Sequence, residues 1–248
     1  MSALNPLGIP FIELPTIDST NNYAMGMVHA GMAHHGTAVF THEQTKGKGQ
    51  RNRLWLSQKD QNIALSLVIQ PQNLLLSELF ILSRAVANGV CDFFNMYTTD
   101  SVKIKWPNDI YWCDRKAGGI LIENVLKGQE WKFAIAGVGL NINQTYFPGL
   151  ETKAVSLRQI TGKNYEPLVL AKELCTFIDN QFNTLLNDRE KIRNDYAAHL
   201  YKLNEKVKMK KGNRLFEAVV CGVSEDGRLI VQHATEEYFA VGEVEWII

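Results

Sequence analysis

The feature that most constrains the fold is a series of three apolar, β-type runs at 110–112, 119–125 and 131–140, separated only by short turns. Strands joined by so few residues pair antiparallel, because a parallel pair needs a crossover of a dozen or more residues. An alternating run at 102–106 precedes them and is stopped by Pro107, which lacks the N–H that a strand ladder needs. The chain is therefore predicted to contain a mixed or antiparallel sheet.

Helical periodicity flanks these strands in the sequence. Apolar residues recur at helical spacing over 75–94 and 167–186, and a polar, charged helix is expected to continue to about residue 200. A short helix is expected after the oxygen-rich capping segment 18–22. Two more strands are expected at 37–40 and 63–69, with a long polar loop between them. This combination predicts an α+β fold in which helices flank the sheet.

The pattern changes near residue 205. Short β-like runs follow, punctuated by Lys-Gly and Asp-Gly turns, and they lie at 207–209, 215–223, 229–233, 238–241 and 244–248. Five such runs predict a small β barrel. We therefore expect two domains, a larger one at 1–200 and a small C-terminal β domain at 201–248.

Charge and cysteine content argue against several classes of protein. The 248 residues include 26 basic and 26 acidic ones, so no whole-molecule field draws the chain to nucleic acid or anionic lipid. No signal peptide or apolar run of membrane-spanning length is visible. The four widely spaced cysteines predict reduced, mostly packed thiols in the cytoplasm. The pair His34-His35 lacks a companion at metal-binding spacing.

The first motif that indicates chemistry is the loop from Gln44 to Trp55, which places four cations around two glycines. Glycine lets backbone N–H groups approach a ligand, and cations offset negative charge, so the loop favours an anionic ligand. A solvated basic loop that ends in a core tryptophan fits this segment equally well. The spacing matches neither a P-loop nor a dinucleotide-binding fingerprint.

The second motif surrounds a strand that ends in Trp-Pro and delivers Asn108 and Asp109 to a turn. A carboxylate and an amide oxygen suit a hard cation such as magnesium. Lys116 follows, before two glycines at the start of an apolar strand, where a lysine would be partly desolvated and held against an anionic substrate. A surface turn lysine is the alternative. Asp114 and Arg115 are expected to be ordinary turn residues.

The third motif, 137–143, puts Gly137 and Gly139 on one face of a strand. Two missing side chains would clear a slot for a flat or chain-like ligand, although a β-bulge explains the glycines equally well. Phosphate-binding cations, a magnesium carboxylate, a lone lysine and a cleared slot together suit the activation of a carboxylic acid by ATP. Such activation forms a reactive acyl-adenylate. The long loop 44–62 could close over this intermediate and exclude water.

At these motifs the sequence resembles the biotin protein ligases, also called biotin–[acetyl-CoA-carboxylase] ligases or holocarboxylase synthetases. The resemblance covers nearly the whole chain, and its specificity lies in the order and spacing of five motifs. These are Ser19-Thr20-Asn21, the loop from Gly47-Lys48-Gly49 to Trp55, Lys105-Trp106-Pro107-Asn108-Asp109, Asp114 to Leu121, and Gly137 to Asn141. It implies a class II synthetase-like catalytic domain and a small SH3-like barrel.

The resemblance also implies a reaction and its residues. Biotin and MgATP would give biotinyl-5′-AMP and pyrophosphate, and the biotinyl group would pass to a lysine of a biotin carboxyl carrier domain. By motif, biotin would contact Ser19, Thr20, Asn21, Gln44, Gly47, Lys48, Gly49, Gln50, Lys116, Gly119 and Gly137. ATP would contact Lys48, Arg51, Arg53, Trp55, Lys105, Asn108, Lys116 and Asn141. Lys116 would contribute most to the reaction rate. Asp109 would assist the second step, and Asn108 or Asp109 would lie near magnesium.

The glycine-rich loop departs from the family's commonest G-R-G-R-R-G pattern. Lys48 and Gln50 replace the first and the second of the three arginines, and Asn52 replaces the last glycine. Lysine cannot make the bidentate phosphate contact of arginine. We therefore hypothesise that this loop holds the adenylate less tightly, partly compensated by Arg51 and Arg53. The variant Gln50→Arg should then release biotinyl-AMP more slowly than the wild type, and equal release rates would contradict the hypothesis.

Other functions remain open at this stage. Only 18 residues precede Ser19, and they include three prolines and no basic residue, so we expect no DNA-reading helix and a ligase without repressor activity. No membrane contact is expected, and a homodimer is left open. Lipoate ligases share the adenylate route. A non-enzymatic binding module is a further alternative. It is based on the cations Lys202, Lys206, Lys208, Lys210, Lys211 and Arg214. A solvated edge strand, or a docking surface for an acidic carrier domain, explains these cations better.

Overall fold

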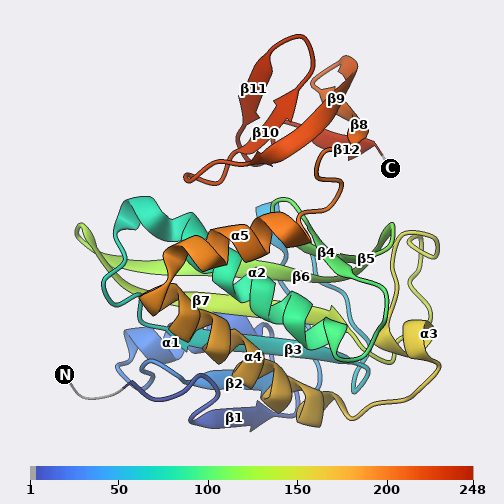
Figure 1. Ribbon diagram of the computed structural model, residues 1–248. Coiled ribbons are helices and arrows are strands. Elements are labelled where there is room, and N and C mark those ends of the chain that lie inside the picture. Colours follow the sequence, from blue (N-terminus) through green and yellow to red (C-terminus); the bar gives the residue numbers. More distant parts are fainter. Residues whose placement is uncertain (1–3, 248) are drawn as a thin grey trace.

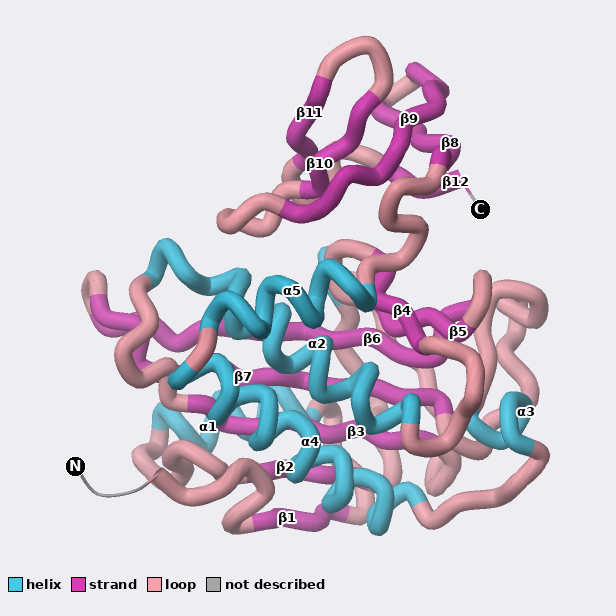
Figure 2. The backbone as a smooth tube through the Cα atoms, in the orientation of Figure 1, coloured by secondary structure: helices cyan, strands magenta, loops and turns pink. Residues whose placement is uncertain are grey.

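The computed structural model describes residues 4–247, so the outermost ends of both expected domains, 1–3 and Ile248, lie outside the described residues, as does the side chain of Asn52. A large sheet with helices on both faces forms one body, and a small sheet sits above it (Figure 1). The large body and the small sheet are also visible in the backbone trace of Figure 2. The α+β class predicted from the sequence is confirmed.

The large sheet has seven strands in the order β1-β2-β3-β7-β6-β5-β4. Only the first pair, β1 with β2, is parallel, and every other neighbouring pair is antiparallel. The predicted meander is therefore present as β4 to β7 of a mixed sheet. The strands are β1 Phe11–Leu14, β2 Ala38–Thr41, β3 Asn62–Ile69, β4 Val102–Lys105, β5 Asp109–Trp112, β6 Arg115–Lys127 and β7 Glu130–Asn141.

The helices cover both faces of this sheet. One face packs against α2, α4 and α5, and the opposite face carries α1 over Val39, Val68 and Ile135. This double cover explains why all eight residues of β3 are buried, although their apolar pattern alternates. The helices are α1 Thr20–His29, α2 Leu79–Asn95, α3 Leu157–Thr161, α4 Pro167–Asn187 and α5 Arg189–His199, with 3-10 turns at Gln50–Asn52 and Leu76–Glu78.

The C-terminal sheet has five antiparallel strands in the order β11-β10-β9-β8-β12. They are β8 Lys206–Lys211, β9 Arg214–Val223, β10 Leu229–Gln232, β11 Glu236–Phe239 and β12 Glu245–Ile247. The expectation that the lysine-rich strand lies at an edge is wrong, because β8 pairs with β9 on one side and β12 on the other. Its lysines alternate with Val207 and the buried Met209, which is the pattern of a strand with one wet face. The division at residue 200 stays a prediction.

Several contacts hold the C-terminal sheet in place against the large body. The buried guanidinium of Arg84 in α2 donates to the carbonyls of Val223 and Ser224 at 2.9 and 2.8 Å. Trp106 Nε1 donates to the carbonyl of Gly227 at 2.8 Å. Gly227 has a φ of +88° and packs so closely on Phe80 that a Cβ there would overlap its ring. The turn between β9 and β10 is thereby held against α2.

One smaller expectation needs correction. The thiols of Cys91 and Cys175 are buried, but those of Cys113 and Cys221 are exposed, so the cysteines are not mostly packed. The structure also records no helix between residues 4 and 247 that is long and apolar enough to cross a membrane.

Candidate functional site

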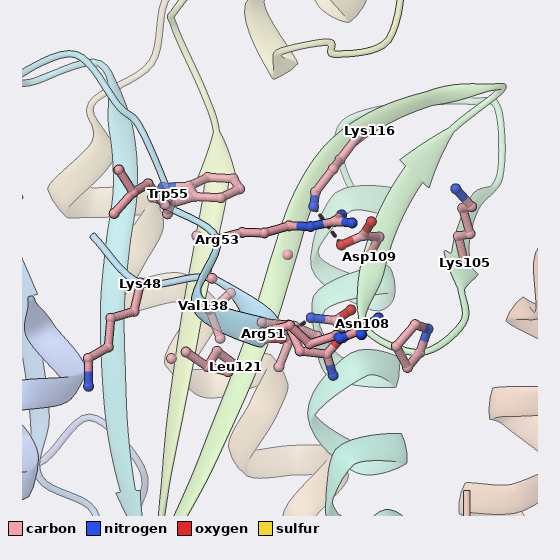
Figure 3. A pocket seen from close by; sticks show the side chains of 18 of the residues that line it. Lys48, Arg51, Arg53, Trp55, Lys105, Asn108, Asp109, Lys116, Leu121 and Val138 are labelled. Carbon is pink, nitrogen blue, oxygen red and sulfur yellow. Dashed lines mark hydrogen bonds and ion pairs between the residues drawn. The ribbon is translucent and has the colours of Figure 1, made fainter. Parts of the chain in front are cut away.

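A cavity of about 630 Å³ opens between the end of the large sheet, the loop 44–56 and the last strand of the C-terminal sheet. Its floor is formed by β3, β6 and β7, and Figure 3 shows the side chains of 18 of its lining residues. Of the residues predicted to bind biotin or ATP, all but Gly47 line this cavity. Motifs that are far apart in the sequence therefore meet at one place.

One end of the cavity is a largely buried network of hydroxyl and amide groups at the start of α1, and this network ends on the carboxylate of Glu123. The backbone N–H and the hydroxyl of Thr20 both donate to Gln44 Oε1, at 2.9 and 3.2 Å. Ser66 Oγ lies 2.8 Å from Thr20 Oγ1 and 2.5 Å from Asn21 Oδ1. Asn21 Nδ2 in turn donates to Glu123 Oε2 at 2.8 Å. Because buried polar groups are costly when unpaired, this network holds each side chain in one orientation. Ser66 belongs to none of the motifs identified in the sequence.

The two glycines of β7 do not leave an empty slot. A Cβ at Gly137 would overlap the carboxamide of Asn21, and a Cβ at Gly139 would lie 2.6 Å from Cε2 of Trp55. The space cleared by glycine is thus occupied by two side chains from α1 and the glycine-rich loop. The expectation of a free slot is corrected: the glycines allow Asn21 and Trp55 to approach the sheet and form the walls of the cavity.

The glycine-rich loop folds back on itself above the cavity. Trp55 N donates to the carbonyl of Gly47 at 2.9 Å, and Gly49 N donates to that of Arg53 at 2.7 Å. A Cβ at Gly47 would overlap the carbonyl of Trp55, so this glycine shapes the loop without lining the cavity. Lys48 Nζ lies 3.3 Å from Glu123 Oε1 and points away from Lys116 in Figure 3.

The centre of the cavity holds an ion pair. Lys116 Nζ lies 2.6 Å from Asp109 Oδ1, and the ammonium is 5.9 Å from the ring of Trp55. Figure 3 shows the side chain of Arg53 extending toward this pair. Lys116 is about one third exposed, so the surface lysine considered from the sequence is not what the structure contains.

Two side-chain amides hold the backbone near Lys116. Asn141 Nδ2 donates to the carbonyls of Lys116 and Val155 at 3.3 and 3.1 Å. Asn108 Nδ2 donates to the carbonyl of Ile120 at 2.7 Å. Both side chains line the cavity, and both also fix the backbone around the lysine. The structure therefore gives them a positioning role that sequence reasoning did not assign.

Asp114 and Arg115 are not the ordinary turn residues that were expected. Arg115 donates twice to the carbonyl of Ala154, at 3.0 and 2.7 Å, and Asp114 accepts a hydrogen bond of 2.6 Å from Tyr201 Oη. The first contact joins β6 to the segment that precedes α3. The second joins it to the connection between the two sheets. Neither partner lies near the turn in the sequence, so the motif alone could not reveal them.

The magnesium site expected at Asn108 and Asp109 stays a prediction. One oxygen of Asp109 is engaged by Lys116, and the amide N of Asn108 binds a carbonyl. Among residues 4–247 no group of three or more His, Cys, Asp or Glu side chains could hold a metal ion. Asn108 and Asp109 alone do not fit a resident metal ion.

Sequence reasoning missed several lining residues. The segment from Val241 to Trp246, which includes the start of β12, reaches the cavity from the C-terminal sheet, and Arg51 Nη1 lies 3.4 Å from the carbonyl of Gly242. Phe147, Leu150 and Lys153 enter from the loop after β7. No motif marks these residues, because only the packing of distant segments brings them to the site.

Comparisons with known proteins match this geometry. The model of the biotin/lipoate A/B protein ligase family matches residues 13–141. The bifunctional ligase/repressor BirA of Bacillus spizizenii is 25% identical over 230 residues, covering 91% of this chain and 70% of that protein. The biotin–[acetyl-CoA-carboxylase] ligase of Paracoccus denitrificans is 28% identical over 227 residues, covering 88% and 92%.

The fold has a solved counterpart as well. The structure of the biotin protein ligase from Aquifex aeolicus in complex with biotin and ATP has a TM-score of 0.79 and 25% identity, covering 96% of this chain and 98% of that one. The chain spans 39 to 70% of the length of the BirA relatives that it matches.

Proposed function

Because the chain belongs to the biotin/lipoate A/B protein ligase family, we propose that it is a biotin protein ligase: it activates biotin with MgATP and transfers the biotinyl group to a lysine of a biotin carboxyl carrier domain. The relatives and the solved counterpart named above support biotin as the acid. The proposal includes a cytoplasmic location, which suits the exposed free thiols of Cys113 and Cys221.

The proposal rests on one observation: Lys116 lines the same cavity as two chemically different groups of side chains. The first group is the polar network of Thr20, Asn21 and Gln44. The second group is the cations Arg53 and Lys105. A ligand with a neutral polar ring and a carboxylate fits the first group, and a triphosphate fits the second. The ammonium of Lys116 would then stand where carboxylate and phosphate meet.

In the first step, a carboxylate oxygen of biotin attacks the α-phosphorus of ATP, the bond from that phosphorus to the bridging oxygen breaks, and pyrophosphate leaves. Two anions must approach each other, so cations that face the developing charge lower the barrier. Lys116 can contact both reacting groups, and Arg53 extends toward the same point. A magnesium ion bound to the nucleotide would offset the negative charge of its phosphates.

In the second step, the amine of the acceptor lysine attacks the biotinyl carbonyl, an amide bond forms, and AMP leaves with the bonding electrons. The amine loses a proton in this step. Asp109 is the carboxylate hydrogen-bonded to Lys116 at 2.6 Å, and we assign it the role of assisting this proton transfer. The loop 44–56, folded over the cavity, keeps water from the adenylate between the two steps.

The buried network also favours biotin over lipoate. The ureido ring of biotin offers N–H donors and a carbonyl acceptor, whereas the dithiolane of lipoate offers neither. A site lined by hydrogen-bonding side chains binds a ligand with matching polar groups more tightly than an analogue that lacks them. Thr20, Asn21 and Gln44 are such side chains.

Exchange of labelled pyrophosphate into ATP tests the proposal. It measures the reversal of adenylate formation and needs no carrier protein. A biotin ligase supports exchange only with biotin, a lipoate ligase only with lipoate, and a binding module supports none. The three functions considered from the sequence are thereby separated in one assay.

A further inference from the structure

Lys105 lies between two aromatic rings that come from different sheets. Its ammonium is 4.9 Å from the ring centroid of Tyr111 in β5 and 5.7 Å from that of Trp246 in β12. Nζ also donates to Tyr111 Oη at 3.2 Å. Both rings line the same cavity as the lysine. A cation near an aromatic face is attracted by the negative face of the ring, most strongly where water is excluded.

Lys105 and Lys116, which both line the cavity, have different partners. Lys116 forms an ion pair with Asp109, whereas within residues 4–247 no carboxylate oxygen lies within 4.0 Å of Lys105 Nζ. The aromatic rings hold Lys105 without neutralising it. Its charge stays available to an anionic ligand.

Trp246 is itself held in place. It pairs with Met209 in the ladder between β12 and β8, and its ring lies 6.0 Å from that of Tyr201. The ring of Tyr201 lies 5.3 Å from that of Tyr111, so three rings form a continuous row beside the lysine. The docking of the β9–β10 turn on α2 keeps this arrangement fixed relative to the large sheet.

We propose that Trp246 is a positioning residue for Lys105, and that the C-terminal sheet completes the nucleotide end of the site by covering this lysine and directing its ammonium toward the phosphates. The proposal rests on the proposed function, because it takes ATP as the ligand. It gives the C-terminal sheet a role in nucleotide binding that acts through one side chain.

The charges around Lys105 make the role measurable. Burial lowers the pKa of Lys105 to about 8, and the cations Lys116, Lys153 and Arg53 lower it further, against the opposite effect of Asp109. The other titratable groups that line the cavity nearby are Tyr111, whose pKa burial raises to about 12, and Glu245 of β12. At pH 8 the free protein therefore carries a partly neutral Lys105. A bound triphosphate raises this pKa, so the site takes up protons, at most about half a proton per chain.

Calorimetric titration with MgATP at pH 8, in buffers of different ionisation enthalpy, measures this uptake in the absence of biotin. In Trp246→Leu, water reaches Lys105, its pKa rises toward that of an exposed lysine, and the uptake should fall toward zero. The Kd for MgATP should increase about tenfold. Trp246→Phe keeps an aromatic face and should retain most of both properties. Lys105→Met should abolish the uptake.

The matched control is Phe216→Leu, which shortens an aromatic side chain in β9 of the same sheet, outside the cavity. It should keep the wild-type proton uptake and Kd. Equal uptake by wild type and Trp246→Leu, the same loss in Phe216→Leu, or persistent uptake in Lys105→Met would each overturn the proposal. If MgATP binds with the expected changes but no biotin is activated, the biotin assignment fails and the role of Trp246 is supported.

Discussion

Replacing Lys116 with alanine is expected to slow biotinyl-AMP formation by about 10²- to 10³-fold, the usual cost of removing one preorganised group that stabilises charge in a transition state. Lys116 is placed in the cavity by the β5–β6 pairing and by Asn141, which binds its backbone carbonyl. The variant also leaves Asp109 without its partner, 2.6 Å from where the ammonium was, so an uncompensated carboxylate would face the phosphates. Both effects disfavour the approach of two anions.

Pyrophosphate exchange measures this step, and two further variants separate its causes. Lys116→Ala with Asp109→Asn removes the unpaired carboxylate, so any activity it restores over Lys116→Ala reports the cost of that charge. Lys191→Ala breaks a lysine–carboxylate ion pair on α5, outside the cavity, and should exchange at the wild-type rate. Near-normal exchange by Lys116→Ala would remove the main role assigned to this lysine.

Gly137→Ala is expected to weaken biotin binding strongly. The new Cβ would overlap the carboxamide of Asn21, which must then move away from Ser66 and Glu123. Displacement of a positioned group by about 1 Å typically costs about 100-fold, and we expect an increase of that order in the KM for biotin. The KM for ATP should change far less, because Gly137 and Asn21 belong to the end of the cavity that holds the polar network.

Gly26→Ala is the control for this change. Gly26 lies on α1, the same helix as Asn21, and a Cβ there meets no atom within 4 Å. Alanine also has the higher helix propensity, so this variant should keep the biotin affinity and fold at least as stably. The model of the polar network would be contradicted if Gly137→Ala bound biotin like the wild type, or if Gly26→Ala lost affinity equally.

Local patterns in the sequence predicted the elements that depend on local physics. The short turns after 110–112 and 119–125 allowed only antiparallel pairing, and β5 to β7 have it. The apolar spacing of 167–186 corresponds to α4. The strand β1 was missed, because its parallel pairing with β2 depends on a partner beyond α1. The position of β8 was also wrong, since alternation shows which face of a strand is wet but not which neighbours it has.

The sequence motifs predicted many residues of the site, but not the residues that only the packing of distant segments brings to it. The motifs around Lys116 and Gln44 identified cavity residues, because several glycines, amides and cations lie close together in the sequence there. Residues recruited by packing had no signal of their own. Ser66 looks like any strand serine, and Trp246 looks like an ordinary β residue until the docking of the C-terminal sheet places it beside Lys105.

Biotin ligase activity is tested most directly by pyrophosphate exchange by the wild-type chain with biotin, with lipoate and with neither acid. We expect incorporation of labelled pyrophosphate into ATP that requires biotin, and background incorporation with lipoate or without an acid. Exchange supported by lipoate instead of biotin, or no exchange under any of the three conditions, would contradict this expectation.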